Sequence, residues 1–306
     1  MKTICSVIFT LIFLAPCQAQ KQNLILKLEA GKQFKHTTIS TSTIHEVLNG
    51  QDFDMVIKLK GTLSYLVKAV NEKDYDLEVK YESLDMTMQL PQGTSEFSSE
   101  KNDEQDIPSS MLAAIKNKPF QIKMTQQGKV TEVKNIESVW EAAFSKFSQI
   151  PEEQLAPLKA QIIKAYGADA VKGSIEMLTA FFPGKPVSKG DSWTVNTKLE
   201  AAMSADLTTV YKFAEENKDY KLITGSSKIE TTDKDAYIET NGMPMKYNLT
   251  GTMLSEIKVD KSTGWIIEGK VTQEIKGDAI IKENPKMPDG MKIPMTIKNE
   301  ITISNN

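Results

Sequence analysis

The segment from Pro183 to Trp193 constrains the fold of this chain more than any other part of its sequence. Pro183 and Pro186 cannot donate backbone hydrogen bonds, and each disfavours a helical conformation in the residue before it. Gly190 supplies a turn conformation that other residues resist. We therefore predict that a helix ends at Phe182 and a strand begins at Trp193, so that this segment joins a helical block to a second β-rich half.

The half after this joint repeats landmarks of the half before the helical block. Three pairs of segments occur in the same order in the two halves. The first pair is Gly31-Lys32-Gln33-Phe34 with Gly190-Asp191-Ser192-Trp193, and the second is Lys73-Asp74-Tyr75-Asp76-Leu77 with Lys218-Asp219-Tyr220-Lys221-Leu222. In the third pair, Ile122-Lys123 and Gly128-Lys129 match Ile257-Lys258 and Gly264-Trp265. The matches indicate duplication. Each half would bury one face against a shared core, which predicts either one strongly curved sheet or two facing sheets.

The overall pattern predicts an α+β protein, mostly β, in which two pseudo-repeated antiparallel meanders flank a central helical block. Met55, Ile57 and Leu59 alternate with more polar residues, as in a strand with one wet face. We expect a first β-rich half at 20–135, the helical block at 136–182 and a second β-rich half at 183–306, forming one compact unit over 20–306. Residues 92–106 are polar and lack periodicity, which predicts a mobile surface loop.

The helical block carries several large aromatic side chains close together in sequence. Such rings either fill a core or line a ligand cavity, because ligand pockets are mostly apolar. The residues concerned are Trp140, Phe144, Phe147, Phe181 and Phe182. We predict them as candidate lining of an apolar site between the helices and the sheet, and the alternative is that they only fill the core.

Residues 1–19 have the features of an export signal peptide. Lys2 gives a positive start, and the apolar run that follows is too short to span a bilayer of about 30 Å. Cleavage is expected after Ala19, which places the mature chain from Gln20 in the periplasm or outside the cell. The alternative is lipid attachment at Cys17 and a membrane anchor. No later segment is apolar enough to span a membrane, so the mature chain is expected to be soluble or peripherally bound.

Composition argues against nucleic acid as a partner. The chain has 37 basic and 40 acidic residues, a net charge of −3, and all of its basic residues are lysine. Arginine makes the bidentate contacts to phosphate and guanine that the point charge of lysine cannot make. An acidic chain without arginine is therefore expected not to bind nucleic acid.

Motifs for catalysis or metal binding are weak. His36 and His45 would point to opposite faces if one regular strand joined them, which disfavours a metal site that uses both. Ser98 and Lys101 have the Ser-x-x-Lys spacing of penicillin-recognising enzymes, but the Ser-Asp-Asn motif of those enzymes is missing. Both cysteines lie in the signal peptide, which removes thiolate chemistry from the mature chain. The sequence thus predicts no catalytic, cofactor-binding or metal-binding residue, no cofactor and no enzymatic activity.

Four segments together resemble a known protein family. They are the Phe120–Val133 hairpin, the Lys185–Trp193 joint, Asp260–Ile275 and Ile293–Ile303. The sequence is similar here to an exported bacterial family that is catalogued as a domain of unknown function and is found mostly in Bacteroidota. The resemblance covers most of the mature chain, and its motifs are structural turns. It implies an exported β-rich protein and carries over no catalytic residue.

Two classes of function fit these observations. The first is a non-catalytic exported protein whose curved sheet holds an apolar ligand, such as a lipid, under the central helices. Analogy at the level of fold to periplasmic lipid carriers supports this class. The second is an envelope protein that acts through contact with a protein partner. A hydrolase is a weaker third alternative, because paired carboxylates need not be close in sequence.

Overall fold

The fold is described from a computed structural model, which covers residues 21–101, 103, 105–147, 151–200, 204–240, 243–285 and 287–305. The expected signal peptide, the cleavage site before Gln20 and the alternative lipid site at Cys17 lie outside the described residues. They stay predictions.

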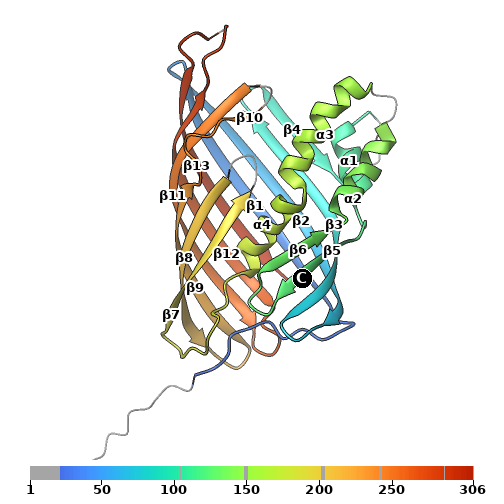
Figure 1. Ribbon diagram of the computed structural model, residues 1–306, viewed down its shortest axis with the longest axis vertical. Coiled ribbons are helices and arrows are strands. Elements are labelled where there is room, and N and C mark those ends of the chain that lie inside the picture. Colours follow the sequence, from blue (N-terminus) through green and yellow to red (C-terminus); the bar gives the residue numbers. More distant parts are fainter. Residues whose placement is uncertain are drawn as a thin grey trace, which may run out of the picture.

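One antiparallel sheet of thirteen strands forms most of the protein (Figure 1). Its strands are β1 (Gln33–Leu48), β2 (Gln51–Val70), β3 (Asp74–Leu90), β4 (Gly93–Ser98), β5 (Phe120–Thr125), β6 (Val130–Lys134), β7 (Ser192–Glu200), β8 (Ser204–Glu216), β9 (Tyr220–Thr231), β10 (Ile238–Thr240), β11 (Met243–Asp260), β12 (Ile266–Ile281) and β13 (Met291–Ser304). Neighbouring strands follow the order β6-β5-β3-β2-β1-β13-β12-β11-β9-β8-β7, with β4 beside β3 and β10 beside β11. This confirms the mostly β prediction and selects one curved sheet over two facing sheets.

The helices lie between β4 and β7 in the chain. They are α1 (Ile107–Ile115), α2 (Ile136–Phe144), the 3-10 turn η1 (Ser145–Phe147), α3 (Glu152–Tyr166) and α4 (Ala168–Thr179). Helix α4 contacts both β6 and β7, the strands at the two ends of the pairing order, and crosses the gap between them (Figure 1). On the β6 side, the backbone N–H of Val130 donates to the carboxylate of Glu176 at 2.8 Å. Helix α4 therefore links the two margins of the sheet.

The predicted internal repeat is visible in the backbone hydrogen bonds. The N–H of Gly31 donates to the carbonyl of Val67 at 2.9 Å, and the N–H of Gly190 donates to the carbonyl of Phe213 at 2.8 Å. Both glycines have positive φ, +79° and +96° respectively. The strand register shifts directly after Val67 in one half and directly after Phe213 in the other. The two halves therefore begin with the same turn and the same bulge.

One of the predicted landmark matches is wrong by one residue. The N–H of Asn71 donates to the carbonyl of Asp74 at 2.8 Å and closes the β2–β3 turn. The equivalent bond of the β8–β9 turn runs from Asn217 to Tyr220 at 3.0 Å. Asp74 thus corresponds to Tyr220 and not to Asp219, because the turn is fixed by the asparagine rather than by the aspartate.

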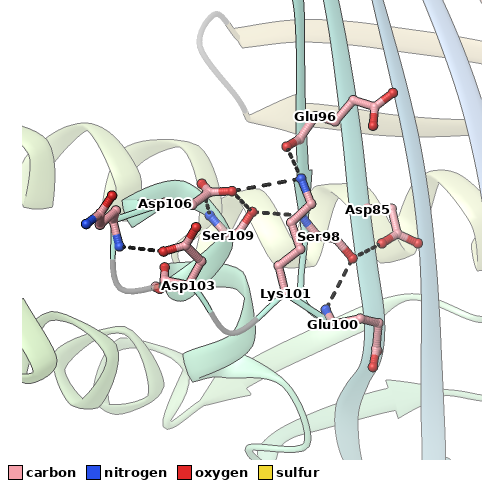
Figure 2. Close-up of polar contacts among 10 residues, drawn as sticks. Asp85, Glu96, Ser98, Glu100, Lys101, Asp103, Asp106 and Ser109 are labelled. Carbon is pink, nitrogen blue, oxygen red and sulfur yellow. Dashed lines mark hydrogen bonds and ion pairs between the residues drawn. The ribbon is translucent and has the colours of Figure 1, made fainter.

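The predicted mobile loop at 92–106 is also corrected, since it contains β4, and the described residues between β4 and α1 make polar side-chain contacts (Figure 2). The hydroxyl of Ser98 donates to the carboxylate of Asp85 on β3. Asp106 caps α1 and accepts from the hydroxyl of Ser109 at 2.6 Å. This segment is held by side-chain hydrogen bonds and has no periodic pattern of apolar residues. Periodicity in the sequence therefore could not reveal its structure.

The start of the described chain closes one end of the sheet, which we call the lower end. Here the N–H of Leu26 donates to the carbonyl of Gln126 at 2.8 Å, and the N–H of Lys27 donates to that of Thr263 at 2.7 Å. Leu24 and Leu26 are buried. The opposite, upper end carries the β1–β2 hairpin. The lower part of the sheet interior is therefore covered by residues 22–28 and by α4.

Candidate functional site

The register of the strands defines which side chains face the concave side of the sheet. Residues paired directly across antiparallel strands lie on the same face. Tyr65, which is fully buried, is paired with Phe34, and the same face continues along β2 through Leu63 to Leu59. These inward positions form the surface on which a ligand could be held.

The lower half of this face is a packed aromatic core. The ring of Trp265 lies 4.9 Å from that of Phe34 and 5.1 Å from that of Tyr65. Its indole N–H donates to the carbonyl of Lys35 at 3.1 Å. This cluster joins the first and last thirds of the chain and leaves the upper half of the face as the place for a ligand.

The upper half of the concave face on β2–β4 is apolar and incompletely covered. Leu59 points inward and yet is 43% exposed. Its cross-strand partner Met86 and the neighbouring pair Ile57 and Met88 are half-buried. We call the inward side chains of Met55, Ile57, Leu59, Met86, Met88 and Phe97 the upper patch. Uncovered apolar patches mark binding surfaces, and methionine adapts its shape to varied ligands.

A small cavity of about 140 Å³ lies below the upper patch, between α4 and strands β1–β3. Its lining residues are His36, Thr38, Leu63, Tyr65, Tyr81, Tyr166, Ala170, Val171, Ser174, Ile175 and Leu178. None of these residues carries a charge at neutral pH. The volume is less than half of the roughly 300 Å³ at which sites for whole small-molecule ligands begin. The cavity could therefore hold one end of a longer molecule.

Two buried polar atoms that belong to lining residues of this cavity lack hydrogen-bond partners among the described residues. They are Nδ1 of His36 and Oγ1 of Thr38. The other ring nitrogen of His36, Nε2, lies 3.3 Å from the hydroxyl oxygen of Tyr65. Burial lowers the pKa of His36 to about 4, so its imidazole is neutral at neutral pH. Burial also raises the pKa of Tyr81 to about 12. The cavity thus offers uncharged polar groups in an apolar surrounding.

A row of five polar side chains, interrupted by one methionine, crosses the concave face from β1 to β8. Its members, in order of strand pairing, are Ser42, Asn299, Gln273, Met253, Ser227 and Thr209. The amide of Asn299 donates to the side-chain oxygen of Gln273 at 2.8 Å, and the hydroxyls of Thr209 and Ser227 are 2.7 Å apart. Our sequence reading missed this row. The signal that could have revealed it is the presence of polar residues at inward positions, where the alternating pattern of these strands calls for apolar residues.

The five aromatic residues that we predicted as site lining are all buried. The rings of Trp140 and Phe144 are 6.3 Å apart, and those of Phe181 and Phe182 are 4.5 Å apart. Phe147 belongs to the same core cluster. None of the five lies among the lining residues of the cavity under α4.

Phe144 instead borders a separate groove of about 760 Å³ between α2 and α3. Leu155 and Ile163 line the same groove, together with Glu137 and Glu141. The structure therefore brings four of the five rings together in two pairs, and the role of all five as lining of an apolar site stays a prediction.

The side chains of the Ser-x-x-Lys motif, Ser98 and Lys101, both make hydrogen bonds within the fold. Figure 2 shows the ammonium of Lys101 directed to the backbone carbonyl of Glu96, at 2.8 Å, while the hydroxyl of Ser98 is engaged by Asp85. His36 faces inward, whereas His45 lies on the opposite face of β1, as its odd spacing predicted. Among the described residues, no group of three or more histidine or acidic side chains is placed to hold a metal ion.

The comparison with protein families gives a match over most of the fold. The family described as "Family of unknown function (DUF6263)" matches residues 72–266. The chain belongs to this family. The DUF6263 match runs from the β2–β3 turn to the first residue of β12 and includes all of the helices. The family description names no enzymatic activity.

Solved structures of similar shape are distant in sequence. A structure titled "Lipid-protein interactions in lipovitellin" has a TM-score of 0.50 and 8% identity, and the match covers 92% of this chain and 25% of that chain. This chain therefore spans a quarter of that lipovitellin chain, and the likeness concerns the fold alone.

Two further structures have much lower TM-scores. An outer membrane channel from Pseudomonas putida F1 has a TM-score of 0.24 and 8% identity, with 95% of this chain and 99% of that chain covered. A putative outer membrane lipoprotein-sorting protein domain from Vibrio parahaemolyticus has a TM-score of 0.14 and 9% identity, with 87% and 83% covered. Neither carries an argument about this chain. A search of the curated proteins found no match. Over the part of the chain that the structure describes, no helix is both long and apolar enough to cross a membrane.

Proposed function

We propose that this protein is an exported, non-catalytic protein that holds an apolar ligand, such as a lipid or acyl chain, on the concave face of its sheet. The observation that carries the proposal is the upper patch. Leu59 faces the concave side and remains 43% exposed, with half-buried methionine and isoleucine side chains beside it. An apolar surface that is exposed to water is unfavourable for a soluble protein. We therefore expect a ligand to cover this part of the concave face.

The energetics favour an acyl chain as the cover. Burying one CH₂ group is worth about 0.8 kcal/mol, so a chain laid along several inward residues would gain several kcal/mol. The methionines at positions 55, 86 and 88 could adapt to chains of different shape. The lipovitellin structure, whose title names lipid–protein interactions, adds support by analogy of fold only.

In this proposal, the aromatic residues of the helical block pack together and hold the helices over the sheet. The indole N–H of Trp140 donates to the carbonyl of Tyr166, at the end of α3, at 3.0 Å. The ring of Phe181 packs against that of Tyr211 on β8, at 6.2 Å. With their neighbours Phe144, Phe147 and Phe182, we propose that these rings form a packed apolar layer behind the helical side of the ligand site.

Native mass spectrometry of the exported protein, purified without detergent, tests the proposal. We expect the mature chain to carry an additional mass that organic extraction releases as lipid. A chain that is free of lipid, and that takes up none from added vesicles, would contradict the proposal. A co-purifying protein subunit in place of lipid would support the alternative of an envelope protein acting by contact. The same spectrum reads the amino terminus, since cleavage before Gln20 and a diacylglyceryl group on Cys17 give different masses.

A further inference from the structure

We propose that the cavity under α4 binds the uncharged, hydroxyl- or carbonyl-bearing head group of an amphipathic ligand, whose hydrocarbon tail lies on the upper patch. This inference rests on the proposed function and specifies the chemical class of its ligand. It predicts that neutral lipids, such as monoacylglycerols, are preferred over fatty acids and over zwitterionic phospholipids.

The position of the cavity supports this arrangement. The buried residues His36 and Tyr65 are among its lining residues. Leu63 lines its wall, and two and four residues further along the same face of β2 come Gly61 and Leu59. A ligand with its polar end at His36 would therefore pass directly onto the upper patch. The cavity volume of about 140 Å³ admits a head group and excludes a whole lipid.

Two buried polar atoms of residues that line the cavity have no hydrogen-bond partner in the part of the chain that the structure describes. Leaving a buried polar group without a hydrogen bond is unfavourable, because the group has lost its contact with water. Nδ1 of His36 and Oγ1 of Thr38 are both in this condition among the described residues, and both residues line the cavity. If the hydroxyl of Tyr65 donates to Nε2 of His36, the ring proton resides on Nδ1 and can be donated to a ligand oxygen. A hydroxyl or carbonyl oxygen would satisfy these groups.

The absence of charge selects against ionised head groups. No lysine and no acidic residue is among the described residues that line the cavity. A carboxylate or phosphate placed there would be buried without a counter-ion, which is far more costly than burying a neutral polar group. Protonation of His36 would not rescue it at neutral pH, because burial lowers the pKa of this residue to about 4.

The test is displacement of the apolar fluorescent probe N-phenyl-1-naphthylamine from the mature chain at pH 7.5. Monopalmitoylglycerol, palmitate and lysopalmitoylphosphatidylcholine share one acyl chain and differ in head group. We expect monopalmitoylglycerol to bind at least about tenfold more tightly than either of the others, since one unpaired buried group is worth about that factor. Equal or tighter binding of palmitate would overturn the inference.

Two variants distinguish binding of a head group in the cavity from binding elsewhere on the concave face. Thr38→Val removes a cavity hydroxyl and should weaken monopalmitoylglycerol several-fold while leaving binding of the apolar probe unchanged. Ser255→Ala is the matched control, because Ser255 Oγ is also buried without a partner among the described residues but lies on β11, away from the cavity lining. An unchanged head-group preference in Thr38→Val would refute this inference but would leave the proposed function standing. If wild type binds neither the probe nor any lipid, the proposed function fails together with it.

Discussion

The hydroxyl of Thr179 donates a hydrogen bond of 2.6 Å to the backbone carbonyl of Gly128. This bond joins the last residue of α4 to the turn between β5 and β6. Because α4 also contacts β7, the attachment holds the helix across the gap between the two margins of the sheet. The cavity under α4, and with it the proposed ligand site, depends on this attachment.

Gly128→Ala should therefore destabilise the protein more than the same change at Gly31. Both glycines have nearly the same φ, +82° and +79°. An added Cβ at Gly128 would overlap the backbone carbonyl of Thr179. At Gly31, no atom of the described residues other than its chain neighbours lies within 4 Å of an added Cβ. Gly31→Ala should cost about 1–2 kcal/mol for the left-handed conformation alone.

We expect Gly128→Ala to exceed that cost by at least about 2 kcal/mol, since the end of α4 must move. Urea unfolding followed by circular dichroism measures both variants. Equal losses at the two positions would mean that the contact of α4 with the β5–β6 turn contributes little.

The sequence was sufficient to predict the local parts of this fold and insufficient for its long-range parts. The joint before Trp193 and the inward alternation of Met55, Ile57 and Leu59 follow from proline, glycine and period-two patterns, which are local. The contact of Phe34 with Trp265, with ring centroids 4.9 Å apart, joins residues from opposite ends of the chain through the β1–β13 pairing. Nothing in either local segment specifies that pairing.

The candidate site was harder to predict than the fold for a related reason. Alternation looks the same whether the apolar face of a strand is covered or open, so the exposure of Leu59 depends on where the helices stop. From the sequence, His36 was considered only as a metal ligand. Its place in an apolar cavity beside Thr38 follows from the position of α4, which local sequence does not encode.

Trp193→Ala should cost about 3–5 kcal/mol, the usual range for removing a buried large aromatic side chain. Trp193 lies at the start of β7, is buried, and donates from its indole N–H to the carbonyl of Phe181 at 2.8 Å. Trp193→Phe should cost about 1–3 kcal/mol, because it keeps a ring but leaves that carbonyl without its donor. Chemical denaturation of both variants tests this, and a loss below about 1 kcal/mol for Trp193→Ala would show that the joint does not organise the fold.

Ala143→Phe tests whether the aromatic residues of the helical block are packed. Ala143 is fully buried in α2, next to Phe144. A phenyl group in a filled core should cost about 1–3 kcal/mol through overpacking. Thermal melting measures the loss. A variant as stable as wild type that no longer binds a fluorescent fatty acid would instead indicate a cavity lined by Trp140, Phe144 and their neighbours.

The buried His36 should make the protein less stable as the pH falls from 6.5 to about 4. Within this window the unfolded chain takes up a proton that the folded chain resists, because burial lowers the folded pKa to about 4. The full loss at lower pH corresponds to about 3 kcal/mol. The titratable groups that line the same cavity, Tyr65, Tyr81 and Tyr166, do not ionise in this range.

His36→Gln should remove this part of the pH dependence, as measured by urea unfolding at several pH values. His45→Gln is the control, because His45 is exposed on the other face of β1 and its pKa is raised by a hydrogen bond to Asp54. A wild-type slope retained in His36→Gln would contradict the burial of a neutral imidazole.

The most direct test of an apolar ligand on the concave face compares Leu59→Asp with Leu254→Asp. Both leucines are exposed on strands, at 43% and 59%, but Leu59 faces the concave side and Leu254 the convex side. Each change should alter stability by less than about 1 kcal/mol. A carboxylate on the upper patch should weaken binding of N-phenyl-1-naphthylamine at least about tenfold, because it removes apolar contact and must be desolvated. Leu254→Asp should leave the affinity within about twofold of wild type, and equal affinities of the two variants would contradict a ligand site on the concave face.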